Sequence, residues 1–357
     1  MGDHMKDIAR MALKNGMEIA TDVTNSNGDV IVKAHTIVSE YTIQKLTRYN
    51  IMLVTIMEDV DYAVTYFEKI RLSAGFKLFE SAYNKAMPVY KKIMNDFVDS
   101  NVSIPIYELM QIYNDIMDSV QGPSKDIVLD YLYNMLPTED DLTYAHCLNS
   151  ALICGVFGHW LALKPEEIEI LVQCGFFYDI GKLKLPYDLI WKPSKLTPIE
   201  FAKIKTHTIL GFQMIQDLPI SDHILKATLS HHERYDGSGY PSKLHDVQID
   251  KFARIIGIID SYEAMTSART YRQSKHPFQV IEIFEQDYAK YDVEILNIIL
   301  YKIANHLVGQ KVLLDNDITA EIILINQNKI SRPLLRDINS TFIDLLSRTD
   351  LKILGIY

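Results

Sequence analysis

The sequence contains little cysteine. Its three cysteines, Cys147, Cys154 and Cys174, are an odd number, and none belongs to a CxxC pair. This count argues against a disulfide framework and against a structural zinc site. A reducing compartment suits such a sequence best, so we expect a cytoplasmic protein.

Long apolar runs and an excess of positive charge are also missing. No apolar run approaches the roughly 18 residues that a membrane-spanning helix needs, so we expect no membrane span. The net charge of −10 argues against a protein that coats a nucleic-acid polymer or an anionic membrane. A nucleotide ligand stays compatible with this charge, because local cations or metal ions reverse the field around a site.

The composition is that of a folded protein with a substantial core. Of the 357 residues, 48% are hydrophobic and 23% are charged, which argues against global disorder. We predict a mainly α fold with small β elements at both termini. Its four regions are a small α/β N-terminal region at residues 6–60, a helical region at 61–135, the main helical domain at 136–305 and a β-rich extension at 306–357.

The two ends of the chain have patterns typical of strands. Residues 17–38 form two short, partly alternating runs around the turn pair Asn27-Gly28, which predicts a β-hairpin. A short helix followed by a closing strand is expected over residues 39–58. Residues 311–335 alternate in a similar way. We expect the two β-like ends to meet in one small sheet beside the helical domain.

Residues 61–135 have apolar side chains at helical spacing. The spacing predicts helices that are broken near residues 101–105 and at Gly122-Pro123. We interpret this apolar stripe as core or interface packing, and its aromatic content would suit a homodimer. The stripe consists of Phe67, Ile70, Phe76, Phe79, Tyr83, Met87, Tyr90, Ile93 and Phe97.

Several polar residues lie in predicted helices that are otherwise apolar. Asp179 and Lys182 are three residues apart and share one helical face, but an ion pair between them explains little at an apolar position. A buried carboxylate without a partner is strongly destabilising, so Asp179 needs one. Further histidines and an aspartate lie in the neighbouring predicted helices: His146, His207, His231, His232 and Asp260.

Four histidines and two aspartates on five successive helices suit a metal centre. A single buried histidine is more often a hydrogen-bonded core residue than a ligand, but helix bundles build metal sites by projecting such side chains inward. Imidazole and carboxylate ligands suit zinc, iron, manganese or nickel. The set is too large for one structural zinc, which takes about four ligands. It suffices for two ions with open positions, and Asp179 would then bridge them.

Five segments of the chain resemble, in order, the motifs of the HD-GYP family, bacterial metal phosphohydrolases that hydrolyse cyclic di-GMP. The most specific segment is HHERYDGSGYP at residues 231–241. The resemblance runs from about Thr138 to His306, and the other segments are TYAHCLNSA, YDIGKLKLP, THTILG and DSYEAMTSARTYR. It implies an all-helical bundle around a two- or three-metal centre, often of iron or manganese.

The resemblance also implies roles for the matched residues. Asp179 and Lys182 would be catalytic, and Lys182 would also bind the substrate phosphate together with Arg269 and Arg272. Tyr240 would lie in a loop beside the site, where it would contact substrate, and this loop would also suit a protein partner. The implied metal ligands are His146, Asp179, His207, His231, His232 and Asp260, with Tyr178 as a further candidate.

Two positions depart from the family pattern. Tyr178 replaces the namesake histidine, so one ion loses an imidazole ligand. Tyrosine ligates ferric iron as a phenolate, but it suits divalent ions poorly at neutral pH, because its unperturbed pKa is about 10. Leu142 stands where three-metal members have a glutamate ligand, so we expect two ions and no third.

The resemblance therefore implies a metal-dependent phosphodiesterase that converts cyclic di-GMP to pGpG, GMP or both. The tyrosine at position 178 keeps a rival open, a degenerate member that acts as a cyclic di-GMP receptor with little or no hydrolysis. Another cyclic dinucleotide or a phosphomonoester is an alternative substrate.

Overall fold

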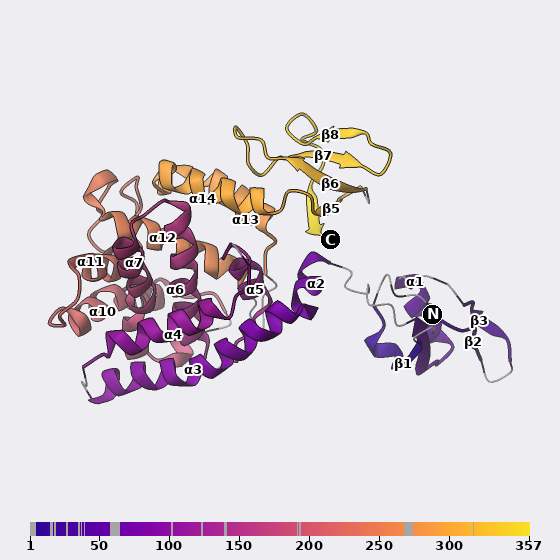
Figure 1. Ribbon diagram of the computed structural model, residues 1–357, viewed down its shortest axis with the longest axis horizontal. Coiled ribbons are helices and arrows are strands. Elements are labelled where there is room, and N and C mark those ends of the chain that lie inside the picture. The colour runs from indigo at the N-terminus through magenta and orange to yellow at the C-terminus, as the bar shows by residue number, and fades with distance from the viewer. Residues whose placement is uncertain are drawn as a thin grey trace. The chain divides into compact units, whose positions relative to one another are not determined.

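The protein divides into two compact units, residues 1–69 and 70–357. A computed structural model describes the whole chain except residues 1–4, 15–16, 18, 26–27, 35, 37, 39, 58–64, 101–102, 123, 139–140, 191, 193, 268–273 and 317. Most helices belong to the second unit, and small sheets lie near both ends of the sequence (Figure 1). The predicted fold class, mainly α with small β elements at the termini, is confirmed. The further division of the second unit at residues 135 and 305 stays a prediction.

The first unit is a small α/β fold. β1 (Met5–Ala9) pairs antiparallel with β4 (Leu53–Met57), and β2 (Val23–Thr24) pairs antiparallel with β3 (Val30–Val32). α1 (Glu40–Arg48) lies between β3 and β4 in the chain. The predicted hairpin, helix and closing strand are confirmed, with the turn residue Asn27 outside the described residues.

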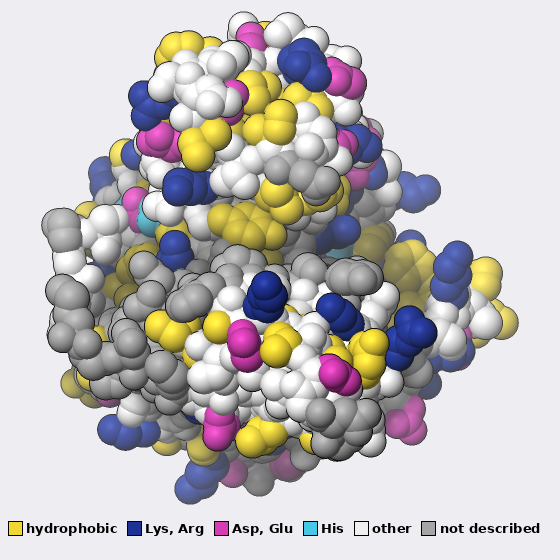
Figure 2. All heavy atoms as spheres, turned by 90° about the vertical axis from the view of Figure 1, so that its right-hand side faces the viewer, with side chains coloured by type: hydrophobic (Ala, Val, Ile, Leu, Met, Phe, Trp, Pro, Cys, Tyr) yellow, Lys and Arg dark blue, Asp and Glu magenta, His cyan; other side chains and the backbone are white. Residues whose placement is uncertain are grey.

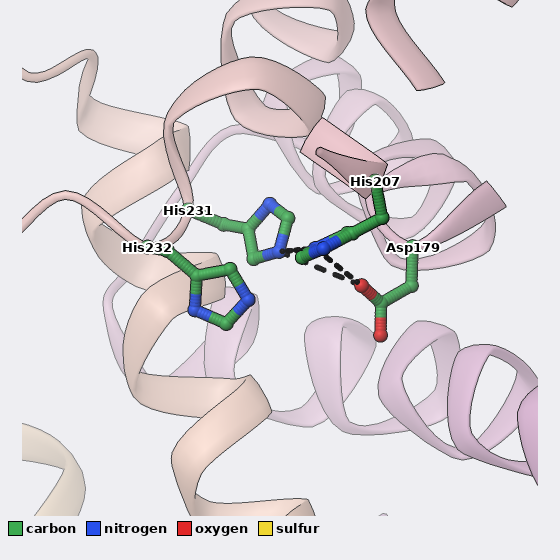
Figure 3. A group of neighbouring side chains, drawn as sticks. All are labelled: Asp179, His207, His231 and His232. Atoms are coloured by element: carbon green, nitrogen blue, oxygen red, sulfur yellow. Dashed lines mark hydrogen bonds and ion pairs between the residues drawn. The ribbon is translucent and has the colours of Figure 1, made fainter. Parts of the chain in front are cut away.

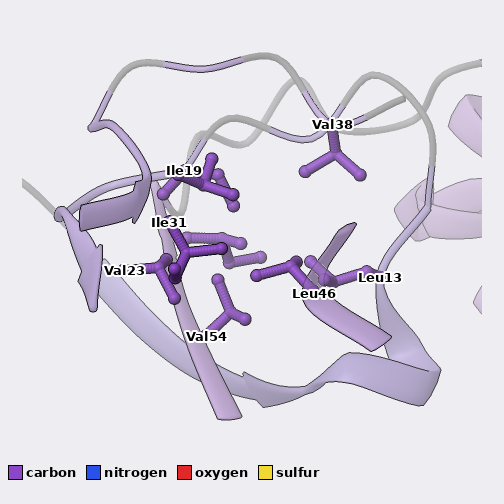
Figure 4. Packing of buried hydrophobic residues seen from close by; sticks show 9 residues of the cluster. Leu13, Ile19, Val23, Ile31, Val38, Leu46 and Val54 are labelled. Carbon is purple, nitrogen blue, oxygen red and sulfur yellow. The ribbon is translucent and has the colours of Figure 1, made fainter. Parts of the chain in front are cut away.

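Buried aliphatic side chains hold this first unit together. Ile19 and Leu46 are fully buried. They meet side chains from the strands and from the end of the 3-10 helix η1 (Arg10–Ala12) in one cluster, seven of whose members are labelled in Figure 4. The cluster consists of Leu13, Ile19, Val23, Ile31, Val32, Val38, Leu46, Val54 and Ile56.

The helical stripe of residues 61–135 forms α2 (Tyr66–Leu72), α3 (Ala74–Ser100), α4 (Ile106–Asp118) and α5 (Val128–Asn134). The two predicted helix breaks are confirmed. All stripe residues except Ile70 are buried within this single chain. The stripe is therefore core packing, and it gives no support to a dimer interface.

α6 (Leu142–Trp160) is the central helix of the second unit. Nearly all of its side chains are buried, as expected for a helix that is apolar on every side. It packs against α3, α7 (Pro165–Phe177), α12 (Lys251–Thr266) and α14 (Val293–His306). The remaining helices are η3 (Ile180–Lys184), α8 (Tyr187–Ile190), α9 (Pro198–Lys205), α10 (His207–Ile215), α11 (Asp222–Ser230), η4 (Asp246–Gln248), α13 (Pro277–Gln286) and η5 (Tyr288–Lys290).

The C-terminal strands form a sheet of their own, which corrects the expectation of one sheet shared by both ends. Five antiparallel strands take the order β8-β7-β6-β5-β9. β9 returns to pair with β5, so the C-terminal segment supplies partners for both sides of β5. The strands are β5 (Lys311–Leu314), β6 (Thr319–Leu324), β7 (Leu334–Asp337), β8 (Phe342–Asp344) and β9 (Ile353–Ile356).

Within the described part of the chain, no helix combines the length and the apolar character that crossing a bilayer requires. On the face drawn in Figure 2, Lys and Arg side chains are interspersed with Asp and Glu side chains among hydrophobic ones. The three cysteines are free and buried.

Candidate metal centre

The predicted ligands come from five places in the second unit. Asp179 lies between α7 and η3, and His207 begins α10. A Cβ atom added to Gly181 would lie 1.9 Å from the carbonyl oxygen of His207. Only glycine therefore lets η3 approach α10 this closely. This close approach brings Asp179 next to His207.

One group of ligand atoms comes from Asp179, His207, His231 and His232, and these atoms lie within 4.8 Å of one another (Figure 3). Asp179 Oδ1 is 3.2 Å from His207 Nε2 and 3.5 Å from His231 Nε2. The two Nε2 atoms are 3.3 Å apart. We call this group the three-histidine half.

The hydrogen bonds of this half leave its ligand atoms able to hold a cation. His207 Nδ1 is 2.7 Å from the carbonyl oxygen of Ile204, and His231 Nδ1 is 3.1 Å from that of Ala227. A carbonyl only accepts, so each Nδ1 carries the proton, and a neutral ring turns a lone pair on Nε2 toward Asp179. Asp179 Oδ1 is itself buried without a hydrogen-bond partner among the described residues. Three acceptors thus converge without a donor, an arrangement that a metal ion would satisfy.

The second group consists of His146, Asp179 and Asp260, and we call it the His146 half. His146 Nε2 is 3.2 Å from Asp179 Oδ2 and 3.1 Å from Asp260 Oδ1. Asp179 therefore turns one oxygen toward each half, which is the geometry of a bridging carboxylate. The Lys182 ammonium also pairs with Asp179 Oδ2. Burial opposes ionisation, but Lys182 and the histidines hold the pKa of Asp179 well below its usual range.

Tyr178 reaches the His146 half. Its side chain is fully buried, and its Oη lies 2.6 Å from His146 Nε2 and 3.0 Å from Ser150 Oγ. Burial and the nearby aspartates raise the pKa of Tyr178 well above its usual value, so these protein groups favour the neutral phenol. The hydroxyl thus points at the nitrogen that a metal on this half would need.

The loop at residues 239–241, which we call the GYP loop, contacts the three-histidine half. The Tyr240 ring stacks on the His232 ring, with centroids 4.7 Å apart and planes inclined by 25°. A Cβ on Gly239 would lie 2.4 Å from Glu233 Cα, so the loop needs glycine there. Glu233, which the sequence did not single out, accepts backbone N–H bonds from Ser242 at 2.6 Å and Leu244 at 3.1 Å. Tyr240 is thereby held beside the ligands.

The remaining site predictions have different outcomes. Lys182, His232 and Asp260 keep side-chain exposures of 18%, 16% and 13%, and they mark the side of the centre that solvent reaches. Arg269 and Arg272 lie outside the described residues.

Glu263, three residues after Asp260 on α12, was not predicted, although its carboxylate contacts His146 Nδ1 in the buried core. The three-residue spacing from Asp260 was the only indication in the sequence.

Comparison with known proteins places these ligands in a named domain. The family model for the HD domain matches residues 130–295. This segment is therefore similar to an HD domain. The match includes all six predicted histidine and aspartate ligands, and the resemblance inferred from the motifs is confirmed.

Curated proteins that are similar to this chain include bacterial phosphodiesterases. A cyclic di-GMP phosphodiesterase of Pseudomonas aeruginosa is 30% identical over 51% of this chain and 44% of its own. The cyclic di-GMP phosphodiesterase response regulator RpfG of Xanthomonas campestris is 34% identical over 44% of this chain and 42% of its own. The 3'3'-cGAMP-specific phosphodiesterase 1 of Vibrio cholerae is 31% identical over 47% of this chain and 39% of its own. The chain thus spans less than half the length of each of these relatives.

Proposed function

We propose that the protein is a metal-dependent phosphodiesterase that hydrolyses cyclic di-GMP to pGpG, GMP or both. The proposal rests on the position of the Asp179 carboxylate, which turns one oxygen to the three-histidine half and the other to the His146 half. The names of the Pseudomonas and Xanthomonas relatives support the substrate class.

The chain would hold two metal ions, with iron or manganese favoured. His207, His231 and His232 would bind one ion, and His146 and Asp260 would bind the other. When bound, the ions would supply Lewis-acid charge and an activated water for attack on phosphorus. A neutral imidazole is the ligating form. Burial lowers the pKa of His207, and burial together with the neighbouring His231 lowers the pKa of His232 well below its usual range.

Lys182 would place a positive charge beside the reacting phosphate, while its ion pair keeps the Asp179 carboxylate in position. Arg269 and Arg272 would add charge-assisted contacts to the phosphates. Tyr240, whose ring already lies flat on His232, would present its other side to the substrate. The partly exposed Lys182, His232 and Asp260 would line the entrance for the dinucleotide.

The test is metal analysis combined with a turnover assay on the purified full chain. We expect about two ions per chain and release of pGpG or GMP from cyclic di-GMP, separated by chromatography. The assay should include 3'3'-cGAMP, because a relative is named for that substrate. Binding of cyclic di-GMP without turnover in the metal-loaded protein would contradict hydrolysis and favour the receptor alternative.

We also propose a cytoplasmic setting, which three free cysteines suit. A homodimer and a protein partner at the GYP loop stay predictions. Sedimentation of the purified chain would test the dimer.

A further inference from the structure

We infer that α3 sets the position of the metal-ligating His146 through a buried chain of hydrogen bonds, Tyr83–Asn149–Glu263–His146. The inference rests on the proposed function, because it takes His146 as a metal ligand. It assigns positioning roles to three residues outside the predicted site. These residues come from three different helices, α3, α6 and α12.

The chain of contacts is continuous. Tyr83 Oη on α3 donates to Asn149 Oδ1 on α6 at 2.7 Å. Asn149 Nδ2 donates to Glu263 Oε1 on α12 at 2.9 Å. The other carboxylate oxygen of Glu263 accepts from His146 Nδ1, and Ser267 Oγ donates to Glu263 Oε1.

Burial makes each hydrogen bond in this series depend on the others. Tyr83, Asn149, Glu263 and His146 have exposures of 4%, 2%, 3% and 6%. Water therefore cannot readily replace a lost partner, and a broken link leaves a buried polar group unsatisfied. Asn149 uses both ends of its amide, so its orientation is determined by a donor on one side and an acceptor on the other.

The chain of hydrogen bonds determines the orientation of Nε2, the metal-facing nitrogen of His146. A carboxylate that accepts from one ring nitrogen of a histidine holds the ring orientation and the tautomer needed at the other. Glu263 occupies Nδ1, so Nε2 is turned toward Asp179 Oδ2 and Asp260 Oδ1. Tyr83 supports Glu263 from the far end of the chain through Asn149.

α3 also reaches the other side of the centre. Tyr90 Oη donates to the backbone carbonyl of Phe176 at 3.1 Å, three residues before Asp179. Lys184 on η3 donates to the carbonyl of Val98 on α3 at 2.7 Å. The helix therefore supports both the Asp179 segment and His146.

The experiment measures Mn²⁺ binding to the metal-free full chain by competition with a chromogenic chelator. His146→Ala identifies which of the two dissociation constants belongs to the His146 half. Glu263→Gln should weaken that constant by about 10- to 100-fold and leave the other unchanged. Tyr83→Phe should weaken it by about fivefold, the effect of one neutral hydrogen bond. Tyr107→Phe removes a hydroxyl from a side chain that is 80% exposed and should change neither constant.

A double variant separates hydrogen-bond geometry from general damage to the fold. In Asn149→Asp with Glu263→Gln, the glutamine can donate to the new aspartate, Tyr83 can still donate to that aspartate, and His146 can still donate to the glutamine oxygen. Affinity at the His146 half should recover at least tenfold relative to Glu263→Gln alone.

Each outcome decides between the two proposals. Two ions in the wild type, with unchanged constants in Tyr83→Phe and Glu263→Gln, would overturn the inference and leave the proposed function standing. No Mn²⁺ binding by the wild type would overturn the proposed function and the inference with it. Equal weakening at both halves, or a double variant as weak as Glu263→Gln, would show that these residues only stabilise the fold.

Discussion

The two halves of the candidate metal centre share Asp179 but are supported in different ways. In the three-histidine half, His207 and His231 direct Nδ1 to the backbone carbonyls of Ile204 and Ala227, three and four residues earlier in the chain. In the His146 half, Nδ1 contacts the Glu263 carboxylate, and Nε2 lies beside the Tyr178 hydroxyl. Backbone support follows from local helix geometry, whereas side-chain support depends on three helices being correctly packed. We therefore expect substitutions of supporting side chains to change the metal affinity of the His146 half more than that of the three-histidine half.

The electrostatics of the two halves also differ. Burial lowers the pKa of His207 and, together with the neighbouring His231, that of His232. Burial would lower the pKa of His146 as well, but Glu263, Asp179 and Asp260 raise it well above its usual value. His207 and His232 thus favour the neutral form, whereas His146 favours the protonated form because three carboxylates contact it.

Substitution of the shared residue should have the largest effect. Asp179→Ala removes the carboxylate that contacts both halves, so metal content should fall from about two ions per chain toward zero. Turnover of cyclic di-GMP should fall by at least about 100-fold with it. Plasma mass spectrometry and the turnover assay measure the two quantities. Retention of one full ion would mean that Asp179 serves a single half.

Single-ligand substitutions should separate the halves. His207→Ala should remove the ion of the three-histidine half, and His146→Ala the ion of the other, so each variant should keep about one ion per chain. His159→Ala, at an exposed position at the end of α6, is the matched control. Loss of both ions in both variants would show that the halves bind metal only together.

Tyr178 should determine the metal affinity of the His146 half. Tyr178→His adds a neutral imidazole, so divalent-metal affinity at this half should rise by roughly tenfold or more, and turnover should rise with it. Chelator competition and the turnover assay measure both.

Tyr178→Phe keeps the ring and removes only the hydroxyl, so it is the control. Loss of a visible charge-transfer colour together with metal in this variant would establish ligation to ferric iron. If Tyr178→His changes neither metal content nor turnover, position 178 does not limit the enzyme, and the receptor alternative loses its main support.

The smallest effect is expected at a histidine–carboxylate pair outside the centre. His306 Nε2 on α14 lies 2.7 Å from Asp130 Oδ2 on α5. Burial would lower the pKa of His306, but Asp130 raises it above its usual value. The stabilisation is fully present below the unfolded pKa of about 6.5 and is lost as the pH rises through the folded pKa.

Calorimetry at two pH values tests this pair. His306→Gln should lower the free energy of unfolding by on the order of 1 kcal/mol at pH 6, and the difference from wild type should shrink as the pH rises through the folded pKa of His306. His159→Gln should leave the Tm nearly unchanged at both values. A difference that grows with pH would contradict the assigned direction. Unchanged metal content in His306→Gln would show that His306 is not a metal ligand.

Local patterns in the sequence determined the helices and the types of side chain that could serve as metal ligands. Apolar spacing placed α3, α4 and α6, and the order of motifs was enough to identify the HD domain. The structure adds why two motif positions carry glycine, because a Cβ atom added at Gly181 or Gly239 would clash with backbone atoms. These features lie within one helix or loop, so a window of a few residues contains the information.

Only the tertiary structure decided which side chains support the ligands. The contact between His146 and Glu263 joins residues 117 positions apart, and that between Tyr83 and Asn149 joins residues 66 positions apart. Tertiary packing also made the stripe on α3 part of the core and gave the C-terminal strands partners of their own. Such pairings depend on how buried surfaces and unsatisfied polar groups match across the fold, and the local spacing of residues carries no record of that match.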